Sequence, residues 1–144
     1  MNSAAHILAT YLIDTHGGFT EPGSSGTWPL YRSFMPDASG IAADIACIYD
    51  TTPDMQGKRV VDGVLSKRSG IQLHIRSDGY DEGYEKITDV VEDLAKVHGA
   101  LVTFDTTQYE IVNISVASDG APIGQDEKKR YHFTANLLAR IVKT

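Results

Sequence analysis

The residues best able to do chemistry, the histidines and the cysteine, are scattered along the chain. No two histidines form a His-x-x-x-His pair, and none stands at metal-ligand spacing from the cysteine. His74 and His132 fall on predicted strands, where they can be cross-strand neighbours, and we expect two half-exposed sheet residues rather than metal ligands. The cysteine lies in an apolar run, residues 45–49, and is expected to be a core residue. These side chains are His6, His16, His74, His98, His132 and Cys47.

Six acids on one predicted helix, residues 80–97, form the second group with chemical potential. Paired carboxylates can serve as general acid and base or hold a divalent metal. The six are spread along the helix and do not converge with a histidine, so we expect a solvated face on which Glu82 pairs with Lys86. The acids are Asp81, Glu82, Glu85, Asp89, Glu92 and Asp93.

The glycine-rich stretches are expected to be turns. Neither residues 23–26 nor residues 120–124 provide the glycine–lysine phosphate cradle, and neither joins a strand to a helix as dinucleotide sites require. Residues 16–18, His-Gly-Gly, are similar to the oxyanion loop of some hydrolases, but the chain has no Gly-x-Ser-x-Gly elbow, so a helix end explains them better. We therefore expect no enzymatic activity, no catalytic residue, no metal site and no cofactor.

One segment is basic in a chain whose formal net charge is −6. Between residues 57 and 70, four bases against one acid leave a local charge of +3. The acidic balance of the whole chain argues against a protein whose main task is to grip nucleic acid. We expect residues 55–69 to be an irregular strand pair or an arm, mobile in an isolated subunit and ordered in an assembly. The bases are Lys58, Arg59, Lys67 and Arg68, and the acid is Asp62.

The bulk composition is that of one domain. A chain of 144 residues with 42% hydrophobic and 22% charged residues can bury a sizeable core. No run approaches the roughly 18–20 apolar residues that a membrane span needs, and no secretory signal is expected. A single cysteine cannot form an internal disulfide, which fits assembly in a reducing cytoplasm.

Hydrophobic periodicity predicts an α+β domain that spans residues 1–144, with the helices packed on one face of a sheet. Residues 51–54 and 119–122 are expected to be turns. The predicted helices are residues 3–16 and 80–97, and the predicted strands are residues 28–35, 44–50, 71–76, 101–104, 109–116 and 129–142. The expected core comprises Ile71, Leu73, Ile75, Tyr84, Ile87, Val91, Leu94, Tyr131, Phe133 and Leu137.

Two stretches carry a resemblance to a known family. Residues 70–76, Gly-Ile-Gln-Leu-His-Ile-Arg, lead into residues 80–84, Tyr-Asp-Glu-Gly-Tyr. Later, Gly124-x-Asp126 leads into Arg130-Tyr-x-Phe133-x-x-Asn136. In this order, the stretches resemble the tail terminator proteins of long-tailed bacteriophages, also called minor capsid or tail completion proteins.

The resemblance implies a mixed, mostly antiparallel sheet with two helices on one face. It also implies a structural virion protein, six copies of which form a ring that caps the tail tube, ends its polymerisation and offers the head-joining surface. The partners would be further copies, the tail tube protein, the head–tail connector protein and phage DNA in transit, with no membrane. Such a protein belongs to the tail and neck of the virion and assembles in the host cytoplasm.

Two groups of residues are candidates for contacts in such a ring. The basic arm is expected to line the lumen or to dock on a neighbour, and the final strand is expected to make inter-subunit or sheet contacts. The alternatives are another head–tail connector or neck protein, a small carboxylate-dependent hydrolase that uses the second helix, and a free-standing binding module. The arm residues are Lys58, Arg59, Lys67 and Arg68, and the strand residues are Arg130, His132, Asn136 and Arg140.

Overall fold

A computed structural model describes residues 2–38, 40–58 and 65–144, which fold into two α-helices and six strands. In chain order the elements are α1 (Ala4–Tyr11), a π-helical turn η1 (Leu12–His16), β1 (Leu30–Arg32), β2 (Ile45–Lys58), β3 (Leu65–Ser77), α2 (Tyr80–Ala95), β4 (His98–Phe104), β5 (Thr107–Gln125) and β6 (Tyr131–Lys143).

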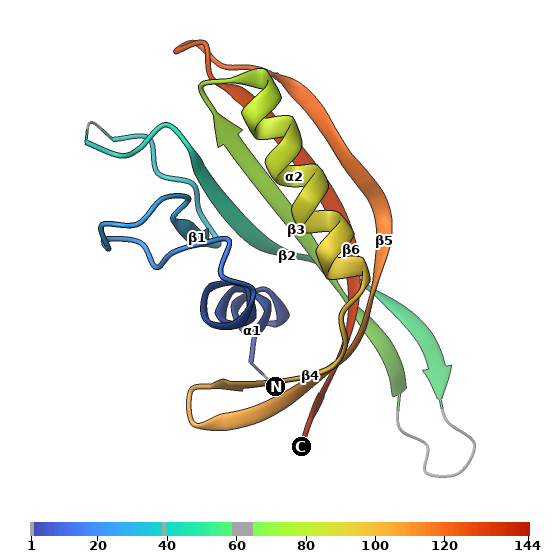
Figure 1. The fold of residues 1–144 in the computed structure, drawn as a ribbon. Coiled ribbons are helices and arrows are strands. Elements are labelled where there is room, and N and C mark those ends of the chain that lie inside the picture. Colours follow the sequence, from blue (N-terminus) through green and yellow to red (C-terminus); the bar gives the residue numbers. More distant parts are fainter. Residues whose placement is uncertain (1, 39, 59–64) are drawn as a thin grey trace.

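The six strands form one sheet in the order β1-β2-β3-β6-β5-β4. β1 runs parallel to β2, and every other neighbouring pair is antiparallel. α2 packs along β3, β5 and β6, while α1 contacts β1 and β4, the two outermost strands, so the sheet curls around it (Figure 1). The prediction of an α+β domain with a mixed sheet and two helices is confirmed.

α1 forms where the sequence signals predict it. Ser3 accepts a hydrogen bond from the backbone N–H of His6 at 3.2 Å, which caps the first turn. Ile7, Leu8 and Leu12 are fully buried against the sheet. The helix continues through η1 and stops at Gly17, whose φ of 78° is the left-handed conformation that glycine adopts without strain.

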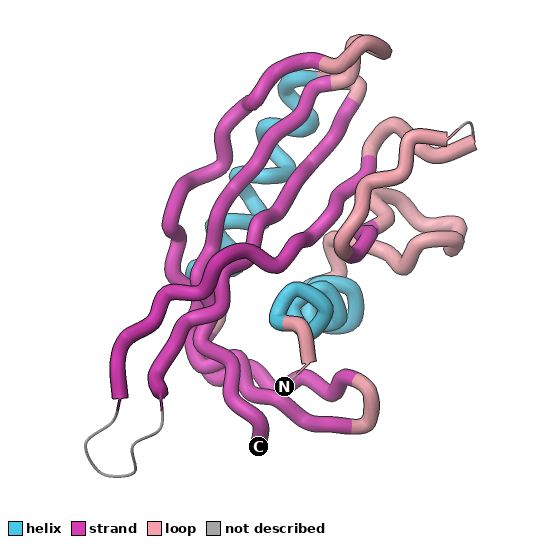
Figure 2. The backbone as a smooth tube through the Cα atoms, turned by 180° about the vertical axis from the view of Figure 1, so that it is seen from behind, coloured by secondary structure: helices cyan, strands magenta, loops and turns pink. Residues whose placement is uncertain are grey.

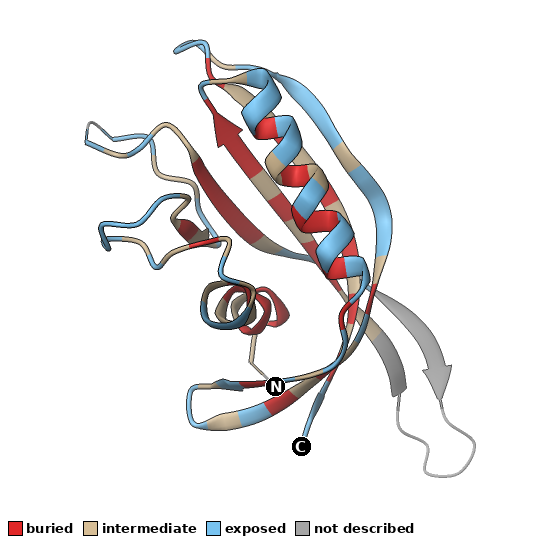
Figure 3. Cartoon of the chain, viewed as in Figure 1, coloured by how far each residue is buried: buried red, intermediate tan, exposed pale blue. Residues whose placement is uncertain are grey.

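α2 presents a narrower apolar face than its sequence suggests, and the expected burial of Tyr84 is wrong. Gly83 faces the sheet, and a Cβ there would lie 2.4 Å from the ring of Phe133, so only glycine permits this close approach. Tyr84 comes one position later, is 45% exposed and lies beside the ring of Tyr80 with centroids 6.1 Å apart. Tyr131 is half-buried and packs against the core. The remaining expected core residues are buried: Ile71, Leu73, Ile75, Ile87, Val91, Leu94, Phe133 and Leu137 (Figure 3).

Two expected turns are instead interior to long strands. β2 does not end at residues 51–54, because a register shift between Thr51 and Asp54 places Pro53 in a bulge, where no ladder donor is required. β5 passes through residues 119–122 with further register shifts against β6. In both places turn-forming residues are accommodated by bulges.

β2 and β3 continue beyond the rest of the sheet as a two-stranded ribbon, residues 54–58 and 65–68 (Figure 2). β6 pairs with β3 only from Ser69 onward, and β1 covers β2 only at residues 46–48. Of the predicted arm, residues 55–58 and 65–69 are therefore paired strand, and residues 59–64 lie outside the described residues. Within the described ranges, neither helix has the length and apolar character that a membrane crossing requires.

Candidate functional site

Asp126 closes the turn between β5 and β6 and is the centre of a polar network. Its Oδ1 accepts hydrogen bonds from the backbone N–H groups of Lys128 at 2.9 Å and Arg130 at 3.0 Å. Its Oδ2 accepts from Arg130 Nε and His132 Nε2, both at 2.9 Å. Desolvation favours the protonated acid, but hydrogen bonds from His132 and Arg130 outweigh it and hold the pKa of Asp126 far below its usual range. The carboxylate thus fixes the conformation of the turn.

The network continues from Arg130 to the segment that precedes β2. Arg130 Nη2 lies 2.9 Å from Asp37 Oδ1, and Lys128 Nζ lies 3.1 Å from the same oxygen. Hydrogen bonds from Lys128 and Arg130 lower the pKa of Asp37. Arg76 is 1% exposed and donates to the carbonyls of Pro36 at 2.9 Å and Ala42 at 3.1 Å. The β5–β6 turn and the loop that precedes β2 are therefore bound to the same end of the sheet.

His74 and His132 lie on the outer face of the sheet, with His74 Nε2 2.8 Å from His132 Nδ1. Because Asp126 Oδ2 is the acceptor at the other nitrogen of His132, His132 Nε2 carries a proton, while the tautomer sets which ring donates between His74 and His132. Burial, together with the charges of His132 and Arg76, lowers the pKa of His74 to about 4. The pair is half-buried, as expected, and forms a chain with Asp126.

Amide and hydroxyl side chains extend the polar face along the same strands. Gln72 Nε2 donates to Asn136 Oδ1 at 3.3 Å, and Asn136 Nδ2 donates to Ser118 Oγ at 2.9 Å. This row crosses β3, β6 and β5. The outer face of the sheet is thus held together by side-chain hydrogen bonds at several levels.

The structure separates the four residues predicted on the final strand. His132, Asn136 and Arg140 alternate with the buried residues of β6 and share its half-buried outer face. Arg130 precedes the strand, is 9% exposed and is occupied by Asp126 and Asp37, so its guanidinium is part of the subunit's own framework. His132 and Asn136 also make hydrogen bonds within the sheet, and contact with another subunit stays a prediction.

Three of the four basic residues of the arm fall on or beside the described part of the ribbon. Lys58 pairs in register with Leu65, and Lys67 with Met55, on the projecting strands. Arg68 is half-buried at the base of the ribbon, where its Nη1 donates to Ser115 Oγ at 3.4 Å. Arg59 lies outside the described residues.

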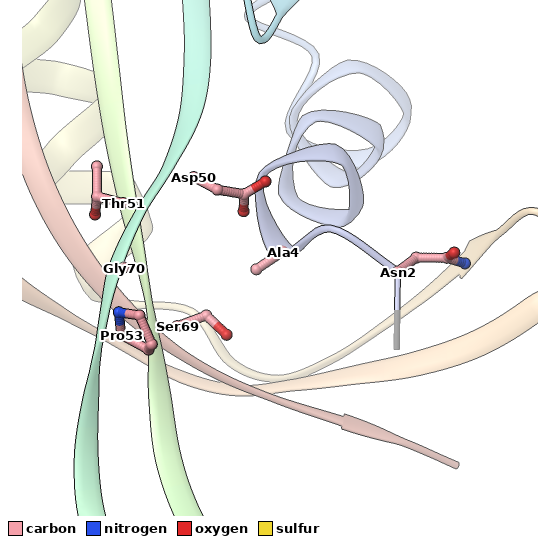
Figure 4. A pocket seen from close by; sticks show the side chains of 7 residues that line it. All are labelled: Asn2, Ala4, Asp50, Thr51, Pro53, Ser69 and Gly70. Carbon is pink, nitrogen blue, oxygen red and sulfur yellow. The ribbon is translucent and has the colours of Figure 1, made fainter.

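A cavity of about 280 Å³ lies where the ribbon leaves the body of the domain (Figure 4). Asp50 Oδ1 accepts the backbone N–H of Ala5 at 2.9 Å, and its other oxygen accepts the hydroxyl of Ser3. A Cβ on Gly70 would meet Thr51 Oγ1 and the Thr52 carbonyl at 2.4 Å, so β2 and β3 are in close contact here. Asp50 thus anchors the start of α1 to the base of the ribbon.

In the described ranges, acids and histidines meet at two places, His16 with Asp93 at 2.8 Å and the chain from Asp126 through His132 to His74. Among the described residues, no three His, Cys, Asp or Glu side chains are placed to hold a metal. Cys47 is buried, its Sγ donates to the Phe34 carbonyl at 3.1 Å, and burial raises the pKa of the thiol. Lys86 was expected to pair with Glu82 at i,i+4 spacing. In the structure its Nζ donates to the Gly18 carbonyl.

Sequence reasoning missed Asp37, and it included Arg76 and Asp126 only within the resemblance. The signal for Asp126 is local: an acid stands four residues before an arginine. In the structure the chain turns between them, with a φ of 61° at Lys129. Asp37 and Arg76 meet only through the fold. A comparison with known proteins adds no relative to these observations: no family model matches the sequence, and no curated protein matches it.

Proposed function

We propose that this protein is a ring-forming structural component of a bacteriophage tail. In this proposal about six copies form a ring that caps the finished tail tube, stops its polymerisation and joins it to the head, without catalytic turnover. The partners are the tail tube protein on one side and the head–tail connector on the other, and DNA passes through the lumen.

The projecting β2–β3 ribbon is the observation that carries the proposal. A two-stranded ribbon is marginally stable when nothing packs on it. Here it extends beyond the strands that flank it, and it carries the basic segment of an otherwise acidic chain. Such an element is suited to contact another molecule, and a ring requires two unlike surfaces on each subunit.

The residues of the family resemblance also have structural roles that support the proposal. Gly83, in the stretch of residues 80–84, lets α2 approach Phe133. Asp126 and Arg130 close the last turn, and Asn136 joins the strands of the outer face. These are framework roles, which suits a protein whose function is to hold a shape.

The test is deletion of the gene in the phage that encodes the protein, followed by electron microscopy of the lysate. We expect tails of uncontrolled length that are not joined to heads, and complementation by the wild-type gene should restore normal particles. Heads without tails, with tails of normal length accumulating free, would favour the connector alternative. Normal, head-attached tails would contradict both assignments.

A further inference from the structure

Two cavities meet at Trp28, the single tryptophan of the chain. One, of about 400 Å³, lies between residues 26–29 and residues 42–44 and reaches Asp78. The other, of about 310 Å³, lies between Trp28 and the first turns of α2. We call the two together the Trp28 groove. Its charged lining residues are Asp44, Asp78, Glu82, Glu85, Lys86 and Asp89.

Lys86 belongs to the wall of the Trp28 groove. Its Nζ donates to the Gly18 carbonyl and lies 4.4 Å from the ring centroid of Phe19 and 5.2 Å from that of Trp28. Burial lowers the pKa of this ammonium, and Asp89 opposes that shift. The ammonium of Lys86 therefore contacts the rings of Phe19 and Trp28 as well as the Gly18 carbonyl.

The groove has the chemistry of a receptor for basic side chains. Five carboxylates line it against the single ammonium of Lys86. Carboxylates bind guanidinium and ammonium groups by charge-assisted hydrogen bonds, and an indole face attracts the same cations. Asp44 also accepts from the Ser77 hydroxyl at 2.8 Å, which fixes one of the five in position.

We propose that the Trp28 groove docks the basic β2–β3 ribbon of a second copy of this chain. The described strands of the ribbon, residues 54–58 and 65–68, carry Lys58, Lys67 and Arg68 against Asp54, a charge of +2 that is opposite in sign to the groove. The ribbon leaves the body at the end away from the start of α2, so one copy cannot fill its own groove and the contact is head-to-tail (Figure 1). This inference rests on the proposed ring and names the contact between neighbouring copies.

Charge reversal on both sides of the contact tests the proposal by sedimentation velocity of the purified protein. Glu82→Lys with Glu85→Lys takes the net charge of the groove lining from −4 to 0, and Lys58→Glu with Lys67→Glu makes the described strands of the ribbon acidic. We expect each pair to weaken self-association by at least about tenfold. Joining all four changes in one chain should restore part of the association, because the lysines introduced at positions 82 and 85 attract the glutamates introduced at positions 58 and 67.

A matched control separates the groove from the general charge of α2. Asp81→Lys with Glu92→Lys makes the same change in charge on the same helix, outside the groove lining, and should leave association within about threefold of wild type. Thermal unfolding of every variant confirms that it is folded. Trp28 gives an internal readout: its fluorescence should change on assembly of the wild type and stay at the monomer value in the groove variant.

Three results would overturn the inference. They are a wild type that remains monomeric at every concentration, groove variants that associate like the wild type, and assembly without a change at Trp28. Assembly of the groove variants into normal rings would contradict the proposed contact but not the proposed ring. Normal head-attached tails after gene deletion would instead contradict the proposed phage function but not the proposed contact.

Discussion

The two ends of the sheet are built in opposite ways. At the Asp126 end, one carboxylate, two arginines and a histidine pair bind the β5–β6 turn and residues 36–43 to the strands. At the other end, β2 and β3 continue as a ribbon. Its described residues, 54–58 of β2 and 65–68 of β3, pair only with each other. Among the described residues, the side-chain contacts therefore concentrate at the Asp126 end, and in the proposed ring the ribbon end is the one that contacts a neighbouring copy.

Removing Asp126 should have the largest effect, because it dismantles the rigid end. In Asp126→Ala the turn loses four hydrogen bonds and the nearly buried Arg130 keeps only Asp37. We expect a loss of about 3 kcal/mol in the free energy of unfolding, measured by urea denaturation. The matched control is Asp119→Ala on exposed β5, where the carboxylate accepts from Gly120 N, and its cost should stay below about 1 kcal/mol. Equal costs would remove the contrast between the two positions.

Acid should weaken the same end through His74. Its pKa is lowered to about 4 in the fold, against about 6.5 in an unfolded chain, so between these values the unfolded state binds more protons. Stability is therefore full above about pH 6.5 and falls as the pH drops toward 4, by roughly 1–3 kcal/mol. The groups that face His74 are His132, Arg76 and the cross-strand Cys47.

Substitution identifies His74 as the source of that pH dependence. His74→Gln should flatten the decline in unfolding free energy between pH 6.5 and pH 4, and His98→Gln, at an exposed position on β4, should leave it unchanged. Urea denaturation at a series of pH values measures both. An unchanged slope in His74→Gln would show that other groups carry the acid sensitivity.

Shortening the ribbon should have the smallest effect on the subunit. Replacing residues 55–67 by Asn-Gly joins Asp54 to Arg68, which are in register, through a favoured hairpin turn. We expect the free energy of unfolding to change by less than about 1 kcal/mol, because no third strand pairs with the described residues of the part removed. The same variant should lose self-association in sedimentation velocity. A large loss of stability would mean that the ribbon is part of the framework.

The sequence was most informative where the signal is periodic and local. The cap at Ser3, the stop at Gly17 and the alternation along β6 all follow from residue type and spacing, because a helix end and a half-buried strand each impose a fixed pattern. The stripe of Ile87, Val91 and Leu94 was predicted for the same reason. The placement of Cys47 in the core follows from the apolar run around it.

Local signals failed where tertiary contacts outweighed them. Pro53 and the Asp119–Pro122 stretch look like turns, yet neighbouring strands hold both in bulged ladders. Tyr84 has the spacing of a core residue, yet Gly83 is the residue that faces the ring of Phe133, and Tyr84 is exposed. In each case the deciding partner is distant in sequence, so no window of the chain contains the information.

By itself, the sequence determined the class of the domain, its helices, its single basic segment and the absence of any familiar catalytic motif. The tertiary structure alone decided which polar residues meet: Asp37 with Arg130, His74 with His132, and the carboxylates of residues 44 and 78–89 around Trp28. The physical reason is that hydrophobic periodicity arises within each helix or strand, so the residues of that element alone reveal it. Polar contacts depend on where two elements cross, and the packing of the whole sheet sets that position.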